Sequence, residues 1–132
     1  MILDTSALLA VLQDEPERAR LVEAIQSAES SSLSVVSYVE SSIVLFARRG
    51  ADAIRDLDLL IAKASIRLVP VDVEQADLAR RAHRDYGKGH HSAGLNFGDC
   101  FAYALARASG EALLYKGADF SRTDVERHPA SA

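Results

Sequence analysis

Cysteine is almost absent from this 132-residue chain, in which Cys100 is the single example. One cysteine cannot form an internal disulfide, so a reducing compartment is the natural setting for the protein. The chain also has no CxxC or HExxH spacing, which excludes the usual zinc centres. Proline and glycine are scarce, with 3 and 7 residues respectively, and this composition argues against a disordered chain.

Long hydrophobic runs are also missing, and none is long enough to cross a membrane. The chain opens on Met1-Ile2-Leu3-Asp4 without the basic and apolar segments of a signal peptide. We therefore expect a cytoplasmic protein that is neither exported nor bound to a membrane. With 48% hydrophobic residues, the sequence predicts one domain over residues 1–132 that needs no disulfide or structural metal.

An excess of basic residues is lacking as well, because the net charge is −4. This charge argues against a protein that coats nucleic acid non-specifically. Residues 80–91 are the exception, since this segment contains several basic and histidine residues and only one acid, Asp85. This run is compatible with a solvated helix face and a polar loop, which is the more common use of such a run, or with a surface that meets a polyanion.

Short apolar segments alternate with amphipathic ones along the whole chain. Strands are predicted at residues 1–3, 33–36, 66–71 and 112–115, and helices at 7–12, 16–28, 37–49, 54–64, 72–86 and 97–109. The segment 87–96 is predicted to be a loop. This alternation indicates an α/β fold with a central, mostly parallel sheet.

Acidic residues recur where these elements begin or end. Asp4 closes the first strand, Glu40 follows the second strand in the first turn of a helix, and Asp119 lies just beyond the fourth strand. Asp99 lies in the first turn of the helix that leads into that strand. Because ligands bind outside the carboxyl ends of parallel strands, we expect Asp4, Glu40 and Asp119 to gather there, whereas the placement of Asp99 depends on the topology of the sheet.

A group of carboxylates this close needs a positive partner. Two of them about 4 Å apart repel by about 4 kcal/mol at an effective dielectric constant of about 20. Oxygen ligands favour Mg²⁺, with Mn²⁺ as the alternative, and such an ion can activate a water molecule against a phosphodiester.

Each acid also has a structural explanation when it is taken alone. Asp4 is compatible with a strand-end cap, and Glu40 with the partner of Ser37 in a capping box. Asp99 would complement a helix dipole, and Asp119 would be a turn residue.

Three sequence blocks favour the functional explanation. Met1 to Ala7 resembles the opening of VapC-type toxins of the PIN-domain family, and Ser37-Tyr38-Val39-Glu40 resembles the segment with their second acid. Gly94 to Ala104 resembles a signature of one VapC subgroup, and the segments 113–120 and 123–124 continue the likeness to about residue 125.

The resemblance implies a PIN-domain-like three-layer α/β/α sandwich and a Mg²⁺-dependent endoribonuclease, the toxin of a type II toxin–antitoxin system. It implies four catalytic, metal-binding acids, namely Asp4, Glu40, Asp99 and a more variable fourth, Asp119. Thr5 or Ser6 would form hydrogen bonds within the cluster. It further implies an RNA substrate, a homodimer, and a VapB-type antitoxin whose C-terminal segment occupies the groove.

The end of the fourth strand departs from the family pattern. Many PIN domains have a small hydroxyl residue there, whereas this chain has Tyr115-Lys116-Gly117. Asp119 would then bind metal through water or only shape the site, and Lys116 would be either a surface residue or a contact to phosphate.

Other functions fit less well. A haloacid-dehalogenase-type phosphatase needs a second Asp two residues after the first, where this chain has Ser6. A receiver domain needs an acceptor Asp after the third strand, and the candidate there, Asp72, resembles a helix cap. A non-catalytic or degenerate PIN-like interaction module is the remaining alternative, and metal-dependent RNA cleavage would separate it from the nuclease.

Overall fold

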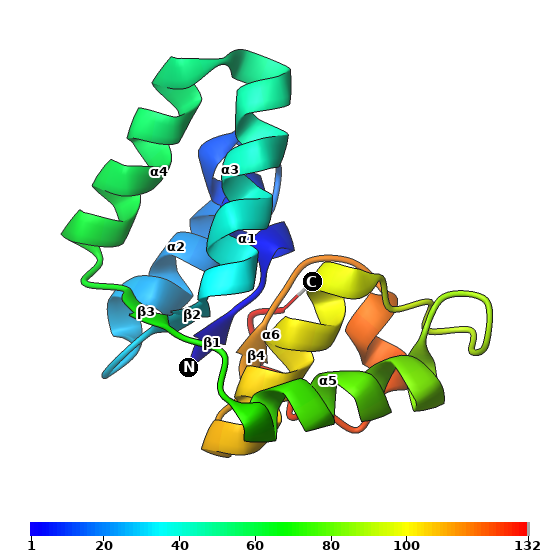
Figure 1. The fold of residues 1–132 in the computed structure, drawn as a ribbon. Helices are drawn as coiled ribbons and strands as arrows, with labels where there is room; N and C mark the ends of the chain where they lie inside the picture. The colour runs from blue at the N-terminus through cyan, green and yellow to red at the C-terminus, as the bar shows by residue number, and fades with distance from the viewer. Residues whose placement is uncertain (132) are drawn as a thin grey trace.

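The computed structural model describes residues 1–131 and places a short sheet between two groups of helices (Figure 1). In chain order the elements are β1 (Ile2–Leu3), α1 (Thr5–Leu12), α2 (Arg18–Ser27), β2 (Ser32–Ser34), α3 (Val35–Arg49), α4 (Ala51–Lys63), β3 (Arg67–Val69), α5 (Val73–Tyr86), α6 (Phe97–Ser109), β4 (Leu113–Leu114) and a 3-10 helix, η1 (Asp119–Arg122). Over the described residues, no helix combines the length and hydrophobicity that a membrane crossing requires.

The sheet has four strands in the order β3-β2-β1-β4, and all neighbouring strands are parallel. In the centre, Leu3 lies opposite Leu33 on one side and Leu114 on the other. The predicted parallel sheet is therefore confirmed, although each strand is only two or three residues long.

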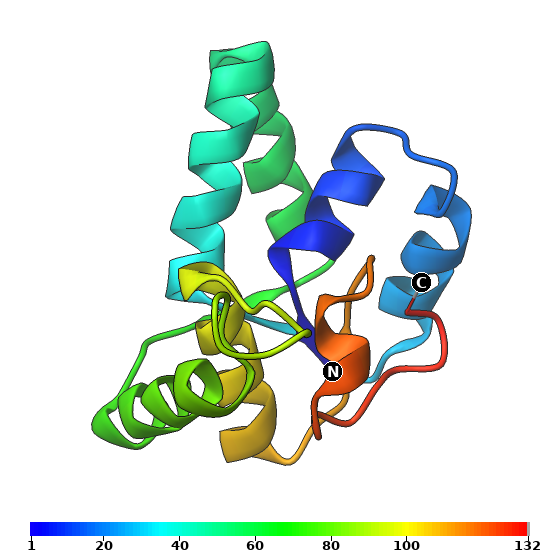
Figure 2. The ribbon, with the colours of Figure 1, turned by 90° about the vertical axis from the view of Figure 1, so that its right-hand side faces the viewer.

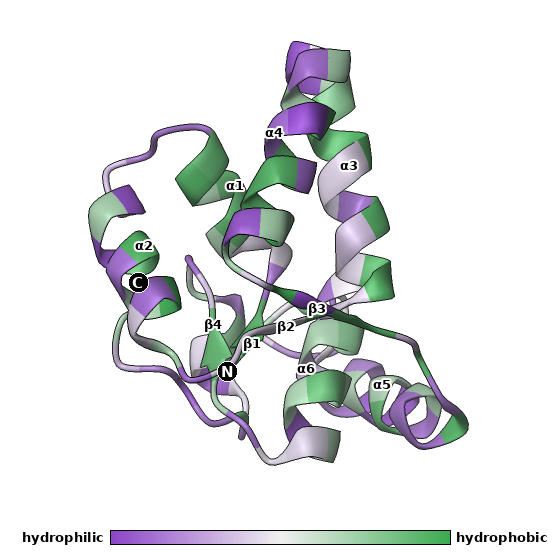
Figure 3. Cartoon of the chain, turned by 90° about the vertical axis from the view of Figure 1, so that its left-hand side faces the viewer, coloured by the Kyte–Doolittle hydropathy of each residue, from purple (hydrophilic) through white to green (hydrophobic). Residues whose placement is uncertain are grey.

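Alternation along these short strands produces two cores. Ile2 and Leu113 face α5 and α6, whereas Leu3, Leu33 and Leu114 face the group α1 to α4. Figure 3 shows the hydrophobic strands β1 and β4 at the centre, with hydrophobic and hydrophilic residues alternating along the surrounding helices. Both faces of a parallel sheet must be covered in this way, and the predicted three-layer α/β/α arrangement is confirmed.

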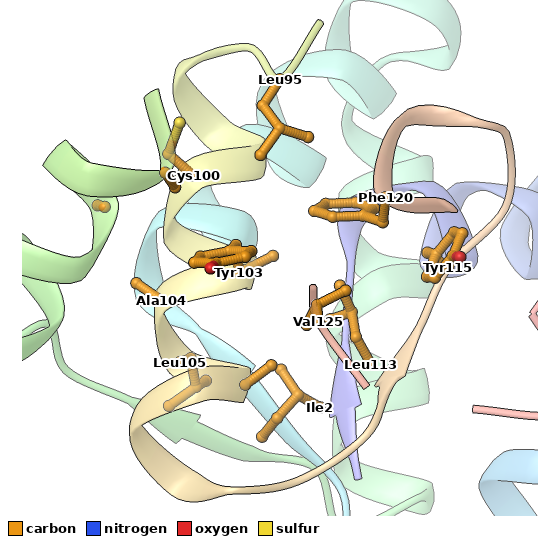
Figure 4. Packing of buried hydrophobic residues seen from close by; sticks show 14 residues of the cluster. Ile2, Leu95, Cys100, Tyr103, Ala104, Leu105, Leu113, Tyr115, Phe120 and Val125 are labelled. Atoms are coloured by element: carbon orange, nitrogen blue, oxygen red, sulfur yellow. The ribbon is translucent and has the colours of Figure 1, made fainter. Parts of the chain in front are cut away.

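The core beneath α6 also includes the C-terminal segment. Figure 4 shows Tyr103 of α6 packed near Phe120, with Tyr115, Leu113 and Val125 beside them. Tyr103 is part of this core, and its phenol donates a hydrogen bond to Asp124 in the C-terminal segment. The C-terminal segment thereby holds the chain beyond β4, where Asp119 lies, against the rest of the fold.

The predicted start of helix α3 is wrong by two residues. Helix α3 begins at Val35, because Ser34 is its N-cap and accepts a hydrogen bond from the Val36 amide at 3.2 Å. Ser37 is therefore buried inside the helix, and the predicted capping box between Ser37 and Glu40 does not form. The predicted cap at Asp72 is confirmed, since its side chain accepts a hydrogen bond from the Gln75 amide.

Helices α3 and α4 form an antiparallel pair that projects from the rest of the molecule (Figure 2). Gly50 joins them with a φ of 76°, a backbone conformation that favours glycine. Three large apolar side chains on α3 remain exposed, namely Val39, Ile43 and Phe46. The pair therefore presents an apolar surface that the described chain does not cover.

Candidate active site

The four predicted acids line one cavity of about 240 Å³. Asp4 follows β1, Glu40 lies in the second turn of α3, Asp99 lies in the first turn of α6, and Asp119 opens η1. Asp4 and Asp99 are buried, Glu40 is half-buried and Asp119 is exposed. The expectation that the acids gather near the strand ends is met, although Glu40 lies one turn further into its helix than predicted.

Asp4 is fixed by the helix that follows it. Its Oδ2 accepts hydrogen bonds from the Ser6 amide at 3.0 Å and from the Ser6 hydroxyl at 2.6 Å. The Ser6 hydroxyl oxygen accepts in turn from the Lys116 amide at 3.0 Å. Asp4 itself therefore caps α1, which begins at Thr5, two residues before the predicted start at residue 7. Its Oδ1 is buried and has no hydrogen-bond partner among the described residues.

Glu40 is held between α1 and α6. The Thr5 hydroxyl donates a 2.6 Å hydrogen bond to its Oε1, so both Thr5 and Ser6 bond within the cluster as predicted. On the other side lies Gly98, where an added Cβ would be only 2.2 Å from Glu40 Oε2. Position 98 must therefore lack a side chain if the Glu40 carboxylate is to lie where it does.

Asp99 combines a cap and a site residue. Its Oδ2 accepts a hydrogen bond from the Asn96 amide at 3.0 Å, and its own amide donates to Asn96 Oδ1 at 2.9 Å. This reciprocal pair is a capping box that opens α6. The structural and the functional explanations of Asp99 are thus compatible, because one oxygen serves the cap and the carboxylate still faces the cavity.

The electrostatics of the cavity disfavour the ionised acids. Burial raises the pKa of Asp4 to about 6, and the nearby Glu40 adds to the rise. Burial also raises the pKa of Asp99 to about 7, with further contributions from Asp4, Asp119 and Glu40. Two groups of like charge that share a poorly solvated site show this behaviour.

Lys116 does not neutralise the cluster, although it lines the same cavity. Its ammonium group lies 2.8 Å from Glu15 and 3.1 Å from Glu17, both in the loop between α1 and α2. These hydrogen bonds raise the pKa of Lys116 and lower that of Glu17. The lysine therefore ties the loop after β4 to the α1–α2 loop, and its charge is matched outside the four acids.

The donor set fits a hard divalent cation. The hydrogen bonds of Asp4, Glu40 and Asp99 each use one carboxylate oxygen and leave the other without a donor among residues 1–131. In that part of the chain, no three His, Cys, Asp or Glu side chains are grouped closely enough to enclose an ion. Mg²⁺ suits such an open site, since it keeps several waters and needs only one or two direct carboxylates.

Two site residues were not predicted from the sequence. Asn96 positions Asp99, and the spacing Asn96-x-x-Asp99 is the signal of a capping box that would have revealed it. Gly98 makes room for Glu40, and no local signal marks it because the contact joins two helices that are distant in sequence.

Known proteins are similar to this chain in sequence. A model of the PIN domain matches residues 1–126. "Ribonuclease VapC" of Mycolicibacterium smegmatis is 52% identical over 125 residues, which cover 95% of this chain and 97% of the relative. "Ribonuclease VapC30" of Mycobacterium tuberculosis is 50% identical over 125 residues, with 95% of each chain covered.

Solved structures agree in fold. Mycobacterium tuberculosis VapC20, described as a Sarcin-Ricin loop cleaving toxin, superposes with a TM-score of 0.78 at 17% identity and covers 96% of this chain and 97% of its own. VapBC2 from Rickettsia felis, bound to a promoter DNA fragment, superposes with a TM-score of 0.75 at 10% identity and covers 96% and 94%. The sequence identity to the ribonucleases and the match of the family model together show that this chain belongs to the PIN-domain family, within its VapC ribonuclease group.

Proposed function

We propose that the protein is the toxin of a type II toxin–antitoxin system and that it cleaves RNA as an endoribonuclease dependent on Mg²⁺ or Mn²⁺. The observation that carries the proposal is the cavity itself, where four acids from four elements meet. At its base, the buried Asp4 Oδ1 lacks a protein partner among the described residues. A buried carboxylate oxygen without a donor is costly unless a cation or water satisfies it.

We propose separate roles for the residues of the cavity, namely ion binding and the orientation of the carboxylates. Asp4, Glu40 and Asp99 would hold the ion, one or two of them directly and the rest through its bound waters. Asp119, which is exposed, would contact it through water or shape the site. A bound divalent cation would supply a water activated for attack and would neutralise charge on the phosphodiester. Thr5, Ser6 and Asn96 orient the three buried or half-buried carboxylates, so that their unused oxygens stay available.

The test is cleavage of RNA by the purified protein. We expect cleavage with Mg²⁺ or Mn²⁺, none in excess EDTA, and recovery when either ion is restored. Undiminished cleavage in EDTA, or recovery with zinc alone, would contradict the proposed chemistry. An Asp4→Asn protein purified in parallel controls for contaminating nucleases. Absence of cleavage under every condition would favour the non-catalytic PIN-like module.

A VapB-type antitoxin is the proposed partner. Similar folds occur in a toxin-antitoxin complex from Klebsiella pneumoniae, in VapBC-1 from Haemophilus influenzae and in FitAB bound to a DNA fragment. In this chain the acidic cavity offers unpaired carboxylate oxygens that suit an inserted arginine or lysine. Co-expression with the protein encoded beside this chain should give a stable complex without RNA cleavage, and addition of Mg²⁺ to the separated chain should restore cleavage.

A homodimer is also proposed. Its support is the uncovered apolar surface of α3, where Val39, Ile43 and Phe46 are more than half exposed, at 54%, 63% and 59%. An apolar patch of this kind commonly marks a protein–protein contact. Light scattering at micromolar concentration should give twice the chain mass, and Ile43→Asp should give a monomer. A monomeric wild type would refute the dimer.

A further inference from the structure

A second cleft lies between α5 and the N-terminal part of α6, with a volume of about 710 Å³. We call it the α5–α6 cleft. Its apolar and aromatic lining, which we call the floor, includes Leu95, Cys100, Phe97 and Phe101. Its rim carries Arg80, His83 and Lys88, and among the described residues no acidic side chain lines it.

We propose that the α5–α6 cleft is a nucleotide subsite, in which one unpaired RNA base lies on the aromatic floor and its phosphates lie against Arg80 and Lys88. The choice of RNA rests on the proposed function. The subsite itself rests on the cleft's charge, its aromatic surface and its position beside the acidic cavity, which are separate observations.

Charge is the first argument. The whole chain carries a net charge of −4, yet the cationic side chains of α5 gather on this side. A hollow next to the cleft is formed by Arg80, Arg81 and Arg84 together with one acid, Asp77. The Asp77 carboxylate is 3.9 Å from Arg80, and both side chains are exposed, so this pair is weak and leaves Arg80 available. A polyanion is the ligand that complements such a surface.

The aromatic floor is the second argument. Phe97 is 75% exposed, and its ring lies 5.0 Å from the ring of Phe101 in an edge-to-face pair. An exposed phenylalanine that is held in place by a second ring offers a stacking surface to a base. Proteins bind single-stranded RNA by this combination of stacking rings and backbone-tracking cations.

Position is the third argument. Asn96 lines both the α5–α6 cleft and the acidic cavity, so the two spaces adjoin. The rim is also held in place, because the amide of Lys88 donates to Leu95 O at 2.9 Å and that of Leu95 donates to Tyr86 O at 3.0 Å. A nucleotide in the cleft would therefore place a neighbouring phosphodiester at the four acids without rearrangement of the loop.

A second copy of the chain would be the competing occupant. Phe97 also borders the apolar groove beside Val39 and Ile43, which carries no basic side chain among its lining residues. That groove has the character of a protein contact. The α5–α6 cleft differs from it by its cationic rim, and two copies would bring these cations together, which favours RNA over self-association there.

The test measures binding of a short, fluorescein-labelled single-stranded RNA by fluorescence anisotropy in excess EDTA. Arg80→Gln with Lys88→Gln should weaken binding and lower the slope of log affinity against log salt by about 1.4, for two lost phosphate contacts. Phe97→Ala should weaken binding by about five- to a hundredfold and leave that slope unchanged. All three side chains are exposed, so the variants should melt like the wild type.

The matched control is Arg55→Gln with Lys63→Gln on α4. It removes the same charge from exposed positions on the opposite side of the sheet and should leave binding unchanged. An abasic nucleotide placed at each RNA position in turn should weaken the wild type at one position and should not weaken Phe97→Ala further there.

Equal RNA binding by wild type, the double variant and Phe97→Ala would overturn the subsite. So would a Phe97→Ala protein that turns from dimer to monomer while its RNA affinity is unchanged, since the cleft would then be a contact between copies. Because binding is read in EDTA, its outcome is independent of cleavage. A protein that binds as predicted but never cleaves would refute the proposed function and leave the subsite standing.

Discussion

Asp99→Asn should make the metal-free protein more stable while it abolishes RNA cleavage. The substitution keeps an oxygen that can accept the hydrogen bond from the Asn96 amide, so the start of α6 is preserved. It removes one negative charge from a site where burial and three neighbouring acids oppose ionisation. Activity should be lost because the ion would lose a carboxylate ligand.

The size of the effect follows from the pKa of Asp99. Folding raises it from 3.8 to about 7, and each unit is worth about 1.4 kcal/mol, so above pH 7 the ionised acid costs roughly 4 kcal/mol. The Asn amide does not recover all of this, and a gain of about 2–4 kcal/mol is expected, equal to roughly 7–15 °C in melting temperature. Because the folded pKa is raised, the cost is present above pH 7 and fades as the pH falls towards 4. The gain should therefore shrink by more than half between pH 8 and pH 5.

Thermal unfolding in EDTA from pH 5 to pH 8 measures this gain. Asp58→Asn is the matched control, since it removes the same charge from an exposed position on α4 and should not change the melting temperature. An Asp99→Asn protein that melts well below the wild type at pH 8 would show that the carboxylate stabilises the fold. The site assignment would then fail.

Four further substitutions test contacts in the cavity and at the start of α3. Gly98→Ala should displace Glu40, because the new methyl would meet the end of its flexible side chain, and we expect normal unfolding in denaturant but much slower RNA cleavage. Glu40→Gln should keep the hydrogen bond from Thr5 and the wild-type stability, and Mg²⁺ should no longer raise its melting temperature. Ser34→Ala should cost about 1 kcal/mol as a lost helix cap, whereas Ser37→Ala should cost nothing, since the Ser37 hydroxyl is buried without a partner among the described residues. A larger loss of stability for Ser37→Ala than for Ser34→Ala would indicate that Ser37 and Glu40 do form a capping box.

Helix and strand patterns were sufficient for most of the fold. The apolar patterns predicted α4, α5 and α6 to within a few residues. Helices α4 and α5 bury one face, whereas α6 is buried along most of its length. Asp72 marked a helix start by its local chemistry, and the predicted range 97–109 is the range of α6; the structure confirms both. Local signals succeed where the determining contacts lie within one turn of the chain.

The start of α3 shows where local signals fail. Ser34 and Ser37 are both plausible caps by residue type, and the Ser37-x-x-Glu40 spacing favoured the second. Strand β2 determines which serine is the cap. Ser34 pairs with Val69 and is the last residue of β2, so the helix can begin directly after it. Only the register of the sheet contains that information.

The four acids and their hydrogen-bond partners Thr5 and Ser6 were predicted from the sequence, whereas the roles of Gly98 and Lys116 were not. Asp4 and Asp119 follow strands, and the geometry of a parallel sheet brings such positions together whatever the helices do. Gly98 and Lys116 matter through contacts with Glu40, Glu15 and Glu17 that depend on how helices and loops pack.

Two acids of the candidate site, Asp4 and Asp99, also form the hydrogen bonds that start helices α1 and α6. Asp4 is the N-cap of α1, and Asp99 is the capping-box partner of Asn96, the N-cap of α6. Each acts through Oδ2 and leaves its other oxygen to the cavity. The helix starts therefore fix the position of the acids at no separate cost in side-chain entropy. Such a carboxylate has two roles: it accepts a hydrogen bond at the start of a helix, and its negative charge would bind the cation. Asparagine separates the two needs because it keeps the acceptor and removes the charge, whereas alanine removes both. The amide substitutions are consequently the ones that distinguish an active site under electrostatic strain from a pair of ordinary helix caps.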